Sequence, residues 1–344
     1  MSSFVVGVDG GTTKTIALVA DGRGCILGAS RGPGSNWSGP NPRIPMGTVE
    51  RTVRRALAEA RLSVEDIALA VCCLAGADWP EDHESRRTLL QASGIARQVV
   101  VKNDAFGGLR AGTSRSYGLV IAAGTAVNAA AIAPDGREWA FGYYADRGGA
   151  KDVARQAMRA VLRAEDGRGR PTALTAAVLE RLGLATPEAM LRAWVAGEIE
   201  QGRINSLCPL VFAAAEAGDE VATQIIVDEG LALAEYAIAL IRRFALQNQP
   251  VDVVLAGSEF KGQGQLLART IQQAIGQVAP HARIVRAQFE PVVGALLLAY
   301  DALGVPSGSE VYANLAASMP GPEFFNTADG GSIERRDRPR ETYR

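Results

Sequence analysis

Short apolar runs alternate with stretches of helical spacing along the first third of the chain. Residues 4–30 have the pattern of strands joined by tight turns. The first two apolar runs are FVVGVD and TKTIALVA, and an Asp-Gly pair then leads into GCILGASRG. Residues 47–61 have apolar side chains at helical spacing, 67–76 form an apolar run, 82–93 are again helical in spacing, and 97–104 return to a strand pattern. This predicts a three-stranded meander followed by alternating helices and strands.

The same order of elements begins again near residue 117. The run YGLVIAAGTAVNAAAIAPDGREWAFG (117–142) reads as strand, Gly-Thr turn, strand, Asp-Gly hairpin and strand. Two such halves predict a duplicated α/β architecture, with the cleft between the halves as the natural ligand site. Residues 149–247 are predicted to be mostly helical. After them the pattern predicts strands at 251–260 and 283–287 and helices at 263–277 and 291–304. The polar tail from Ser307 is expected to be frayed or disordered.

The amino-acid composition is typical of a globular protein and limits the classes of binding partner that we expect. The 344 residues are 47% hydrophobic and 21% charged, with a net charge of −1 and an isoelectric point near 6.2. This length predicts two domains or one large α/β domain. A nearly neutral chain offers no bulk attraction for nucleic acid or an anionic membrane. It has no apolar run of the roughly 18 residues that span a bilayer, and its first residues do not resemble a signal peptide. We therefore expect a cytoplasmic protein with neither partner.

Cysteine and histidine are scarce, which limits the available chemistry. The four cysteines, Cys25, Cys72, Cys73 and Cys208, lack the CxxC spacing of a zinc site. The adjacent pair lies in an apolar run, where small buried side chains are the simplest interpretation. Two histidines occur, each alone in a polar segment. Catalysis should therefore use carboxylates, hydroxyls, backbone amides and a loosely held Mg²⁺.

The end of the first strand is the leading candidate for such chemistry. Bare glycines let backbone N–H groups approach an anion, and threonine hydroxyls and a lysine add donors. A carboxylate beside a phosphate needs a bridging cation, and Mg²⁺ prefers a carboxylate, waters and phosphate oxygens. The alternative interpretation is a plain hairpin turn. The residues concerned are Asp9, Gly10, Gly11, Thr12, Thr13 and Lys14.

The matching turn of the second half contains Gly124 and Thr125, within GTAV. A second loop that faces the first across a cleft would hold a polyphosphate from both sides. An ordinary hairpin is again the alternative, and the pairing of the two turns favours phosphate binding.

Asn103 and Asp104 end the strand pattern of residues 97–104. A carboxylate at the carboxyl end of a strand in an open α/β sheet faces the ligand cleft. There it could accept a proton from a hydroxyl that attacks phosphorus, a role compatible with capping the next helix. Two more polar residues are candidates for sugar contacts: Asn36, in the glycine-rich loop 32–39, and Asp146, just before a predicted helix that it could cap instead.

Taken together, these stretches resemble a known family. The chain is similar to the N-acetylglucosamine/glucosamine kinase branch of the BadF/BadG/BcrA/BcrD group, within the actin/hexokinase/Hsp70 superfamily, over roughly residues 4–304. The resemblance rests on the order and spacing of VGVDGGTTKT, the GSN loop, CLAGADWPED, VVKNDAFGGLRAG, IAAGT, ARQAMRAVLRAEDGRGRPTALT, VVLAGSEF and PVVGALLLA.

The resemblance implies an α/β fold with two ribonuclease-H-like (actin-like ATPase) domains and an interdomain cleft. Residues 1–116 would form the first domain, completed by helix 291–304. Residues 117–290 would form the second, with a helical insertion, and 305–344 a polar tail. The resemblance also implies ATP and Mg²⁺ as cofactors, an amino sugar as the substrate, and a homodimer as the assembly.

The resemblance also implies a role for each residue of this chain that matches a functional position of the family. Asp9 would hold Mg²⁺, and Asp104 would deprotonate the 6-hydroxyl of the sugar. The sugar would also contact Asn36, Asn103 and Asp146. The first phosphate loop would comprise Gly10, Gly11, Thr12, Thr13 and Lys14, the second Gly124 and Thr125, and the adenosine-side turn Gly257 and Ser258.

Two stretches depart from the family pattern. The family's GTGS is GTAV here, so that Ala126 and Val127 replace a glycine and a serine. Its GDEGS is ADRGG, so that Arg147 replaces a glutamate that helps to hold the sugar. Three functions remain in view: an ATP-dependent amino-sugar kinase, a non-catalytic or weakly active nucleotide- or sugar-binding member, and an ATPase activator of a dehydratase. The last uses a pair of well-placed cysteines to hold an iron–sulfur cluster, and no pair here has that spacing.

Overall fold

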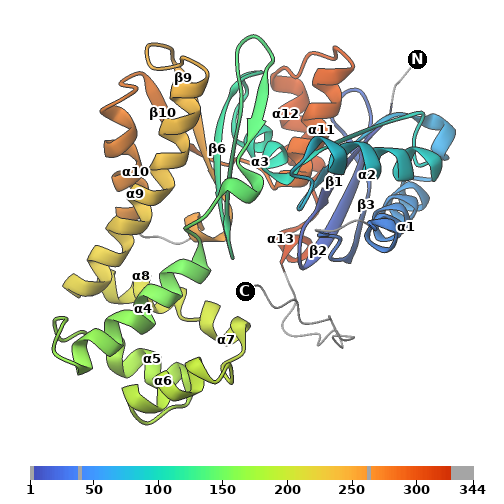
Figure 1. The fold of residues 1–344 in the computed structure, drawn as a ribbon. Coiled ribbons are helices and arrows are strands. Elements are labelled where there is room, and N and C mark those ends of the chain that lie inside the picture. Colours follow the sequence, from blue (N-terminus) through green and yellow to red (C-terminus); the bar gives the residue numbers. More distant parts are fainter. Residues whose placement is uncertain (1–3, 38–40, 262–264, 327–344) are drawn as a thin grey trace.

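The computed structural model describes residues 4–37, 41–261 and 265–326. In these residues the chain forms two lobes that lie side by side, each built around a five-stranded sheet (Figure 1). The strand orders are β3-β2-β1-β4-β5 and β8-β7-β6-β9-β10. In both sheets the first three strands pair antiparallel and the remaining pairs are parallel. The repeated topology confirms the predicted duplication.

The first lobe begins with the predicted meander. Its strands are β1 (Phe4–Gly10), β2 (Lys14–Ala20), β3 (Ile26–Pro33), β4 (Ile67–Leu74) and β5 (Gln98–Asn103). Its helical elements are α1 (Arg43–Ala60), η1 (Val64–Asp66), α2 (Pro80–Ala92) and α3 (Asp104–Gly112). α2 begins at Pro80, two residues before the predicted start, because proline suits the first turn of a helix and the Asp82 carboxylate accepts the backbone N–H of Trp79.

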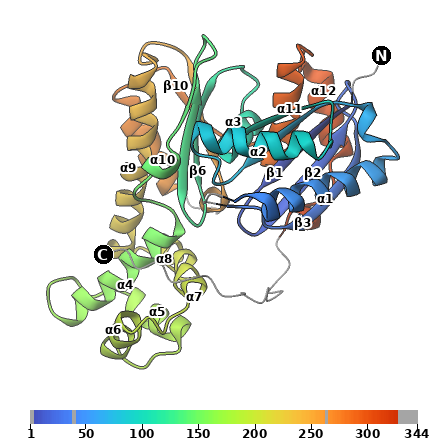
Figure 2. The ribbon, with the colours of Figure 1, turned by 45° about the vertical axis from the view of Figure 1, so that its right-hand side comes forward.

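The second lobe repeats the pattern and adds a helical insertion. Its strands are β6 (Gly118–Ala123), β7 (Val127–Ile132), β8 (Glu138–Ala140), β9 (Val251–Ala256) and β10 (Ala282–Arg286). Its helical elements are η2 (Gly142–Tyr144), α4 (Ala150–Glu165), α5 (Leu174–Leu182), α6 (Pro187–Val195), α7 (Gln201–Asn205), α8 (Cys208–Glu216), α9 (Glu220–Arg243), η3 (Ser258–Phe260) and α10 (Leu266–Gly276). Figure 2 shows that α4–α8 extend below the second sheet, away from the first lobe. The start of the predicted helix 263–277 lies outside the described residues.

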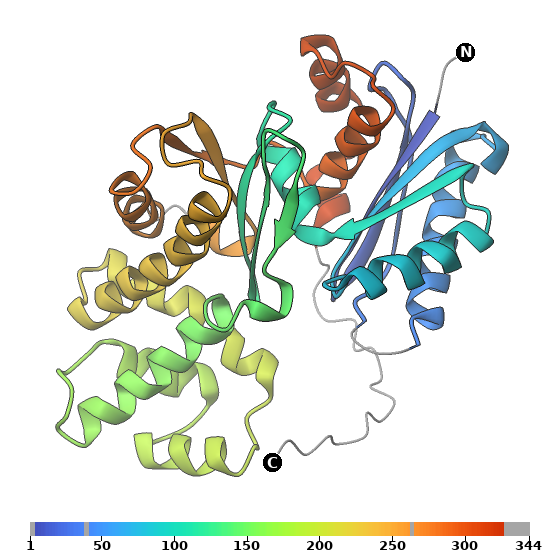
Figure 3. The same ribbon diagram turned by 45° about the horizontal axis from the view of Figure 1, so that its top comes forward.

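Two helices pack against each other between the sheets. α11 (Pro291–Ala302) lies beside α3 in Figures 1 and 3, and its apolar side chains share a core with residues of both sheets. The helices touch through glycines, since a Cβ on Gly294 would lie 1.8 Å from the Gly107 carbonyl oxygen. The two helices therefore form one closely packed pair, and the core that they share with both sheets lies between the lobes.

The tail differs from its prediction where it is described. Instead of frayed chain, residues after Ser307 form α12 (Ser309–Ser318) and α13 (Pro322–Phe325). Val311, Leu315 and Phe325 are buried, because apolar residues spaced for one helix face pack on the first lobe. Residues 327–344 lie outside the described part. The domain boundaries given above stay a prediction. Within the described ranges, no helix is both long and apolar enough to cross a membrane.

Candidate active site

The predicted first phosphate loop is a tight turn between β1 and β2. The turn is closed by a bond from the Gly11 N–H to the Lys14 carbonyl, 2.9 Å long. Gly10 lies where a side chain would require its neighbours to shift, because a Cβ there would lie 2.5 Å from the Ser35 Oγ and 2.6 Å from the Leu74 side chain. Thr12 and Thr13 are exposed at the tip. The turn thus leaves two hydroxyls and the surrounding backbone open to a ligand.

The second loop and the adenosine-side turn lie together. The Gly124 N–H donates to the Ala126 carbonyl at 3.0 Å, and a Cβ on Gly124 would lie 3.6 Å from the Ser258 Oγ. Gly257 has φ +102°, and a Cβ there would lie 2.2 Å from the Ala123 carbonyl oxygen. The structure therefore brings together two predicted nucleotide contacts that are more than one hundred residues apart in sequence.

α4 begins directly behind the second loop. The Ala150 N–H donates to the Gly124 carbonyl at 2.8 Å and the Lys151 N–H to the Thr125 carbonyl at 3.2 Å. A helix N-terminus favours negative charge nearby. Ala126 is exposed at the turn, so the departure from glycine changes the loop surface that faces solvent.

Asp104 lies close enough to Asp9 for its negative charge to affect the protonation of Asp9. Each lies at or beside the end of a parallel strand, Asp9 in β1 and Asp104 directly after β5, and each is partly exposed. Burial raises the pKa of Asp9 to about 7, with a further increase from the negative charge of Asp104. Burial also raises the pKa of Asp104 to about 6, with a further increase from Asp78, while the Asn128 amide and the helix backbone lower it. Two carboxylates that repel in this way form a site for positive charge.

Asn103 connects Asp104 to both lobes. Its Nδ2 donates to the Asp78 carboxylate at 2.7 Å, and its Oδ1 accepts the Asn128 amide at 2.9 Å and the Ala105 N–H at 3.0 Å. The last bond caps α3. Asn128 in turn accepts the Gly142 N–H at 3.0 Å. Asn103 thus fixes the start of the helix that carries Asp104 from both sides.

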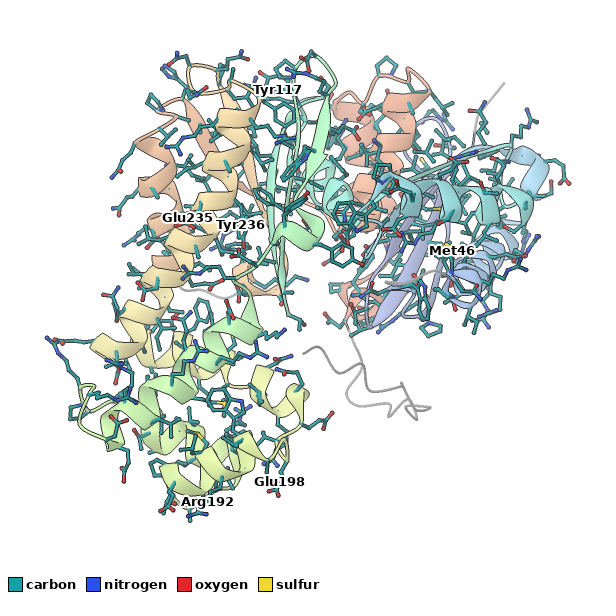
Figure 4. All side chains as sticks on the ribbon, in the orientation of Figure 1. Met46, Tyr117, Arg192, Glu198, Glu235 and Tyr236 are labelled. Carbon is teal, nitrogen blue, oxygen red and sulfur yellow. The ribbon has the colours of Figure 1, made fainter. Side chains whose placement is uncertain are left out.

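The predicted sugar contacts are brought together in part. Asn36 is exposed and donates to the Thr12 Oγ1 at 3.0 Å, so the loop lies against the first phosphate loop. Asp146 is exposed in the second lobe and lies 3.1 Å from the Tyr236 hydroxyl, on α9 (Figure 4). Among the described residues, Asp146 makes no direct hydrogen bond with Asn36 or Asn103. Residues 38–40 of the glycine-rich loop lie outside the described part.

A pocket of about 370 Å³ lies between the lobes next to Asn103. The first lobe contributes Asp78 and Trp79 and the second Trp139 and Tyr143. The Trp79 and Tyr143 rings stack with centroids 5.7 Å apart. Aromatic faces beside a few polar groups are typical of small-molecule sites. A larger surface hollow of about 690 Å³ between α1 and α2 contains none of the predicted site residues.

Charges of both signs surround the first loop. Burial lowers the pKa of Lys14, while Glu290 and Asp9 raise it. The Lys14 Nζ donates to the Phe325 carbonyl, and the Lys261 Nζ pairs with Glu290 at 3.3 Å. The bond to Phe325, in α13, therefore holds Lys14 beside Asp9, and Glu290 partly balances the charge of Lys14.

A divalent cation fits the donor set at Asp9. The Asp9–Asp104 pair leaves excess negative charge that Lys14 offsets only in part. In the described ranges, no group of three or more histidine, cysteine or acidic side chains could hold a metal ion by itself. Mg²⁺ is suited to such a site, because it binds through one or two carboxylates plus waters and phosphate oxygens.

Several contributing residues were not singled out from the sequence. Asp78 and Asn128 are hydrogen-bonded to Asn103, and the charge of Glu290 acts on Lys14. Asp78 lies in the family-like stretch CLAGADWPED and Asn128 directly follows GTAV. Their positions in or beside those stretches were the signal that could have identified these residues. The contacts themselves could not be predicted, because they join parts of the chain that are distant in sequence.

The two five-stranded sheets with matching strand orders define an actin-like ATPase fold, which sugar kinases share. A Streptomyces griseus ROK-family glucokinase, solved with glucose and AMPPNP, has a TM-score of 0.55 at 17% identity, covering 86% of this chain and 99% of that one. A candidate N-acetylglucosamine kinase from Chromobacterium violaceum has a TM-score of 0.62 at 22% identity, covering 86% and 98%. The chain belongs to the BadF/BadG/BcrA/BcrD ATPase family, whose model matches residues 6–299.

Curated relatives are similar over almost their full lengths. The N-acetyl-D-glucosamine kinase of Dictyostelium discoideum is 26% identical over 312 residues, which cover 86% of this chain and 97% of the relative. The N-acetylmuramic acid/N-acetylglucosamine kinase of Clostridium acetobutylicum is 24% identical over 301 residues, covering 86% and 98%. A family of ATPases and sugar kinases implies an ATP-dependent enzyme.

Proposed function

We propose that the protein is an ATP-dependent kinase that phosphorylates the 6-hydroxyl of an amino sugar, N-acetylglucosamine or glucosamine. The observation that carries the proposal is the placement of Asp9 and Asp104 at one edge of the first sheet, where the parallel strands β1, β4 and β5 end together. One carboxylate next to a phosphate loop and a second beside a polar network are the two acidic groups that phosphoryl transfer requires. The similarity to two N-acetylglucosamine kinases supports the choice of sugar.

Asp104 acts as the general base. With a pKa of about 6 it is mostly ionised at pH 7, yet basic enough to accept a proton. The proton of the sugar 6-hydroxyl passes to Asp104 as the oxygen bonds to the γ-phosphorus, and the bond from that phosphorus to the bridging oxygen breaks to release ADP. Asn36, Asn103 and Asp146 bind sugar hydroxyls, and the two glycine loops bind the phosphates.

Asp9 would hold Mg²⁺, directly or through its waters. When bound, the ion neutralises charge on the phosphate oxygens. The chain itself contributes the negative charge of Asp9, the ammonium group of Lys14 and the exposed hydroxyls of Thr12 and Thr13. A homodimer stays a prediction.

The alternative activator function receives no support from the cysteines. Cys72 and Cys73 lie within β4 and are fully buried. Burial raises the pKa of Cys72 to about 12 and that of Cys73 well above its ordinary value. Thiols held protonated inside a sheet are poor ligands for a cluster shared between subunits.

The proposal is tested by ADP release with a panel of amino sugars and plain hexoses in the presence of Mg²⁺. We expect turnover with an amino sugar and none with its 6-deoxy analogue. Asp104→Asn should lower kcat by about 10²- to 10⁴-fold while ATP affinity is kept, because only the base is lost. Asp135→Asn, in an exposed hairpin, is the matched control. Sugar-independent ATP hydrolysis, or full activity of Asp104→Asn, would contradict the proposal.

A further inference from the structure

Arg86 is a buried arginine that the proposed chemistry does not use. It lies on α2 with 1% of its surface exposed, which makes it one of the largest fully buried side chains among the described residues. Its sequence neighbour Arg87 is instead partly exposed and pairs with Glu84 at 2.7 Å on the surface of the same helix. Arginine is almost never fully buried unless its charge has partners.

Its main partners are two backbone carbonyls from separate parts of the chain. The Arg86 Nη2 donates to the Trp37 carbonyl and to the Gly76 carbonyl, both at 2.6 Å. Trp37 directly follows Asn36 in the glycine-rich loop, and Gly76 follows the end of β4. One guanidinium nitrogen therefore joins residues 32–37, the sugar loop, to the first sheet just after the end of β4.

The two backbones meet so closely that little else could join them. Gly76 has φ +75°, and a Cβ there would lie 2.3 Å from the Trp37 carbonyl oxygen and 2.8 Å from the Asn36 Oδ1. Two carbonyl oxygens directed at one point repel each other unless a donor lies between them. A charged donor does this best, because hydrogen bonds to ionised groups are about twice as strong as neutral ones.

The acidic residue Asp82 balances the charge. Its Oδ1 lies 3.6 Å from the Arg86 Nη1, and its Oδ2 accepts the N–H groups of Trp79 and Asp78 at 3.1 and 3.3 Å. Arg86 therefore connects the sugar loop with the segment that places Asp78 against Asn103.

The other side of the loop is held independently. The N–H groups of Ser35 and Asn36 donate to the Gly11 carbonyl at 3.0 and 3.1 Å. The first phosphate loop in turn keeps its own Gly11–Lys14 bond and its place in the β1–β2 pairing. Loss of Arg86 would therefore free the Trp37 end of the sugar loop and leave the phosphate loop in place.

We propose that Arg86 is a positioning residue that sets the orientation of Asn36 for sugar binding. The inference rests on the proposed function. Arg86→Met should raise KM for the sugar about 10- to 100-fold, the range expected when hydrogen bonds from a charged donor are lost. ATP affinity and kcat at saturating sugar should stay near the wild-type values. Arg86→Lys should restore part of the sugar affinity, because an ammonium group can still donate to a carbonyl.

Arg87→Met is the matched control, since it removes the adjacent arginine from the surface. It should leave both KM values unchanged. In an Asn36→Ala background, Arg86→Met should have little further effect on KM, because Arg86 acts through Asn36. Additive effects of the two substitutions, or a KM for Arg86→Met equal to that of Arg87→Met, would overturn the inference.

Two measurements keep the inference separate from the proposed function and from misfolding. Hydrogen exchange of the Asn36 and Trp37 amides, measured without any sugar, should be faster in Arg86→Met than in Arg87→Met. Gly76→Ala disturbs the same junction from the other side and should also raise KM for the sugar, even if Arg86→Met does not fold. If wild-type protein phosphorylates no sugar, the proposed function fails, whereas unchanged exchange at residues 36–37 refutes the role of Arg86 whatever the substrate.

Discussion

Glu259 has a buried carboxyl group, and replacing it with the neutral amide of glutamine should stabilise the protein at neutral and mildly alkaline pH. It follows the adenosine-side turn, is 8% exposed, and neither of its oxygens has a hydrogen-bond partner among the described residues. Burial raises its pKa to about 9, and the negative charges of Glu229 and Asp152 add to the increase. Glu229, on α9, has its own pKa raised to about 7 by burial. Cys208 also lies near this group.

The magnitude follows from the two pKa values. Glu259 titrates near its ordinary pKa of 4.5 in the unfolded chain and near 9 in the folded protein. Between these values the folded state holds a proton that the unfolded state releases, so stability falls as pH rises. Each pH unit removes about 1.36 kcal/mol, which amounts to about 3 kcal/mol at pH 7. Glu259→Gln is neutral at every pH and should not incur this loss.

The assay is urea unfolding of wild type and Glu259→Gln at pH 5, 7 and 8.5. The stability gained by the variant should be small at pH 5, reach about 3 kcal/mol near pH 7 and be larger still at pH 8.5. Glu235→Gln, an exposed position on α9 that Figure 4 labels, should change stability by less than about 0.5 kcal/mol throughout. A gain for Glu259→Gln that does not vary with pH would refute the reasoning, because it would show that the carboxyl group is not protonated in the folded state.

Two further substitutions test the nucleotide and sugar sides. Gly257→Ala should destabilise the protein by about 2 kcal/mol or more and weaken ATP binding, because the methyl group would lie 2.2 Å from the Ala123 carbonyl oxygen. Urea unfolding and ATP titration measure the two effects, with Gly276→Ala as the control because nothing lies within 4 Å of a Cβ there. Equal stability of the two variants would contradict this prediction. Tyr236→Phe removes the hydroxyl that lies 3.1 Å from Asp146 and should raise KM for the sugar about 3- to 10-fold with kcat kept. An unchanged KM in initial-rate kinetics would show that the bond does not orient Asp146.

The duplicated fold could be predicted because its strands and turns each have a recognisable local sequence pattern. Apolar runs punctuated by glycine and Asp-Gly pairs mark β1–β3 and again β6–β8, and the two sheets have matching strand orders. The placement of Asp9 and Asp104 could also be predicted, since the carboxyl ends of parallel strands share one edge of a sheet.

The remaining contacts depend on tertiary packing that no local pattern encodes. Arg86 looks like Arg87 in sequence, and only the folded chain shows that one meets two carbonyls while the other faces solvent. The tail reads as polar, yet Val311, Leu315 and Phe325 are enough to pack its helices on the first lobe. A few apolar residues within a polar stretch give a weak periodic signal, so the prediction of a frayed tail was wrong for residues 309–325.

Asn103 shows why the candidate base occupies the point where the lobes meet. A base on one lobe alone would change its distance to a ligand held by the other lobe whenever the lobes moved. Asp104 begins α3, whose cap Asn103 is bonded to Asp78 in the first lobe and to Asn128 in the second. α3 also contacts α11 through Gly107 and Gly294, at a distance that leaves no space for a side chain. Because the start of α3 is bonded to both lobes, we expect any closure of the cleft to turn near this point.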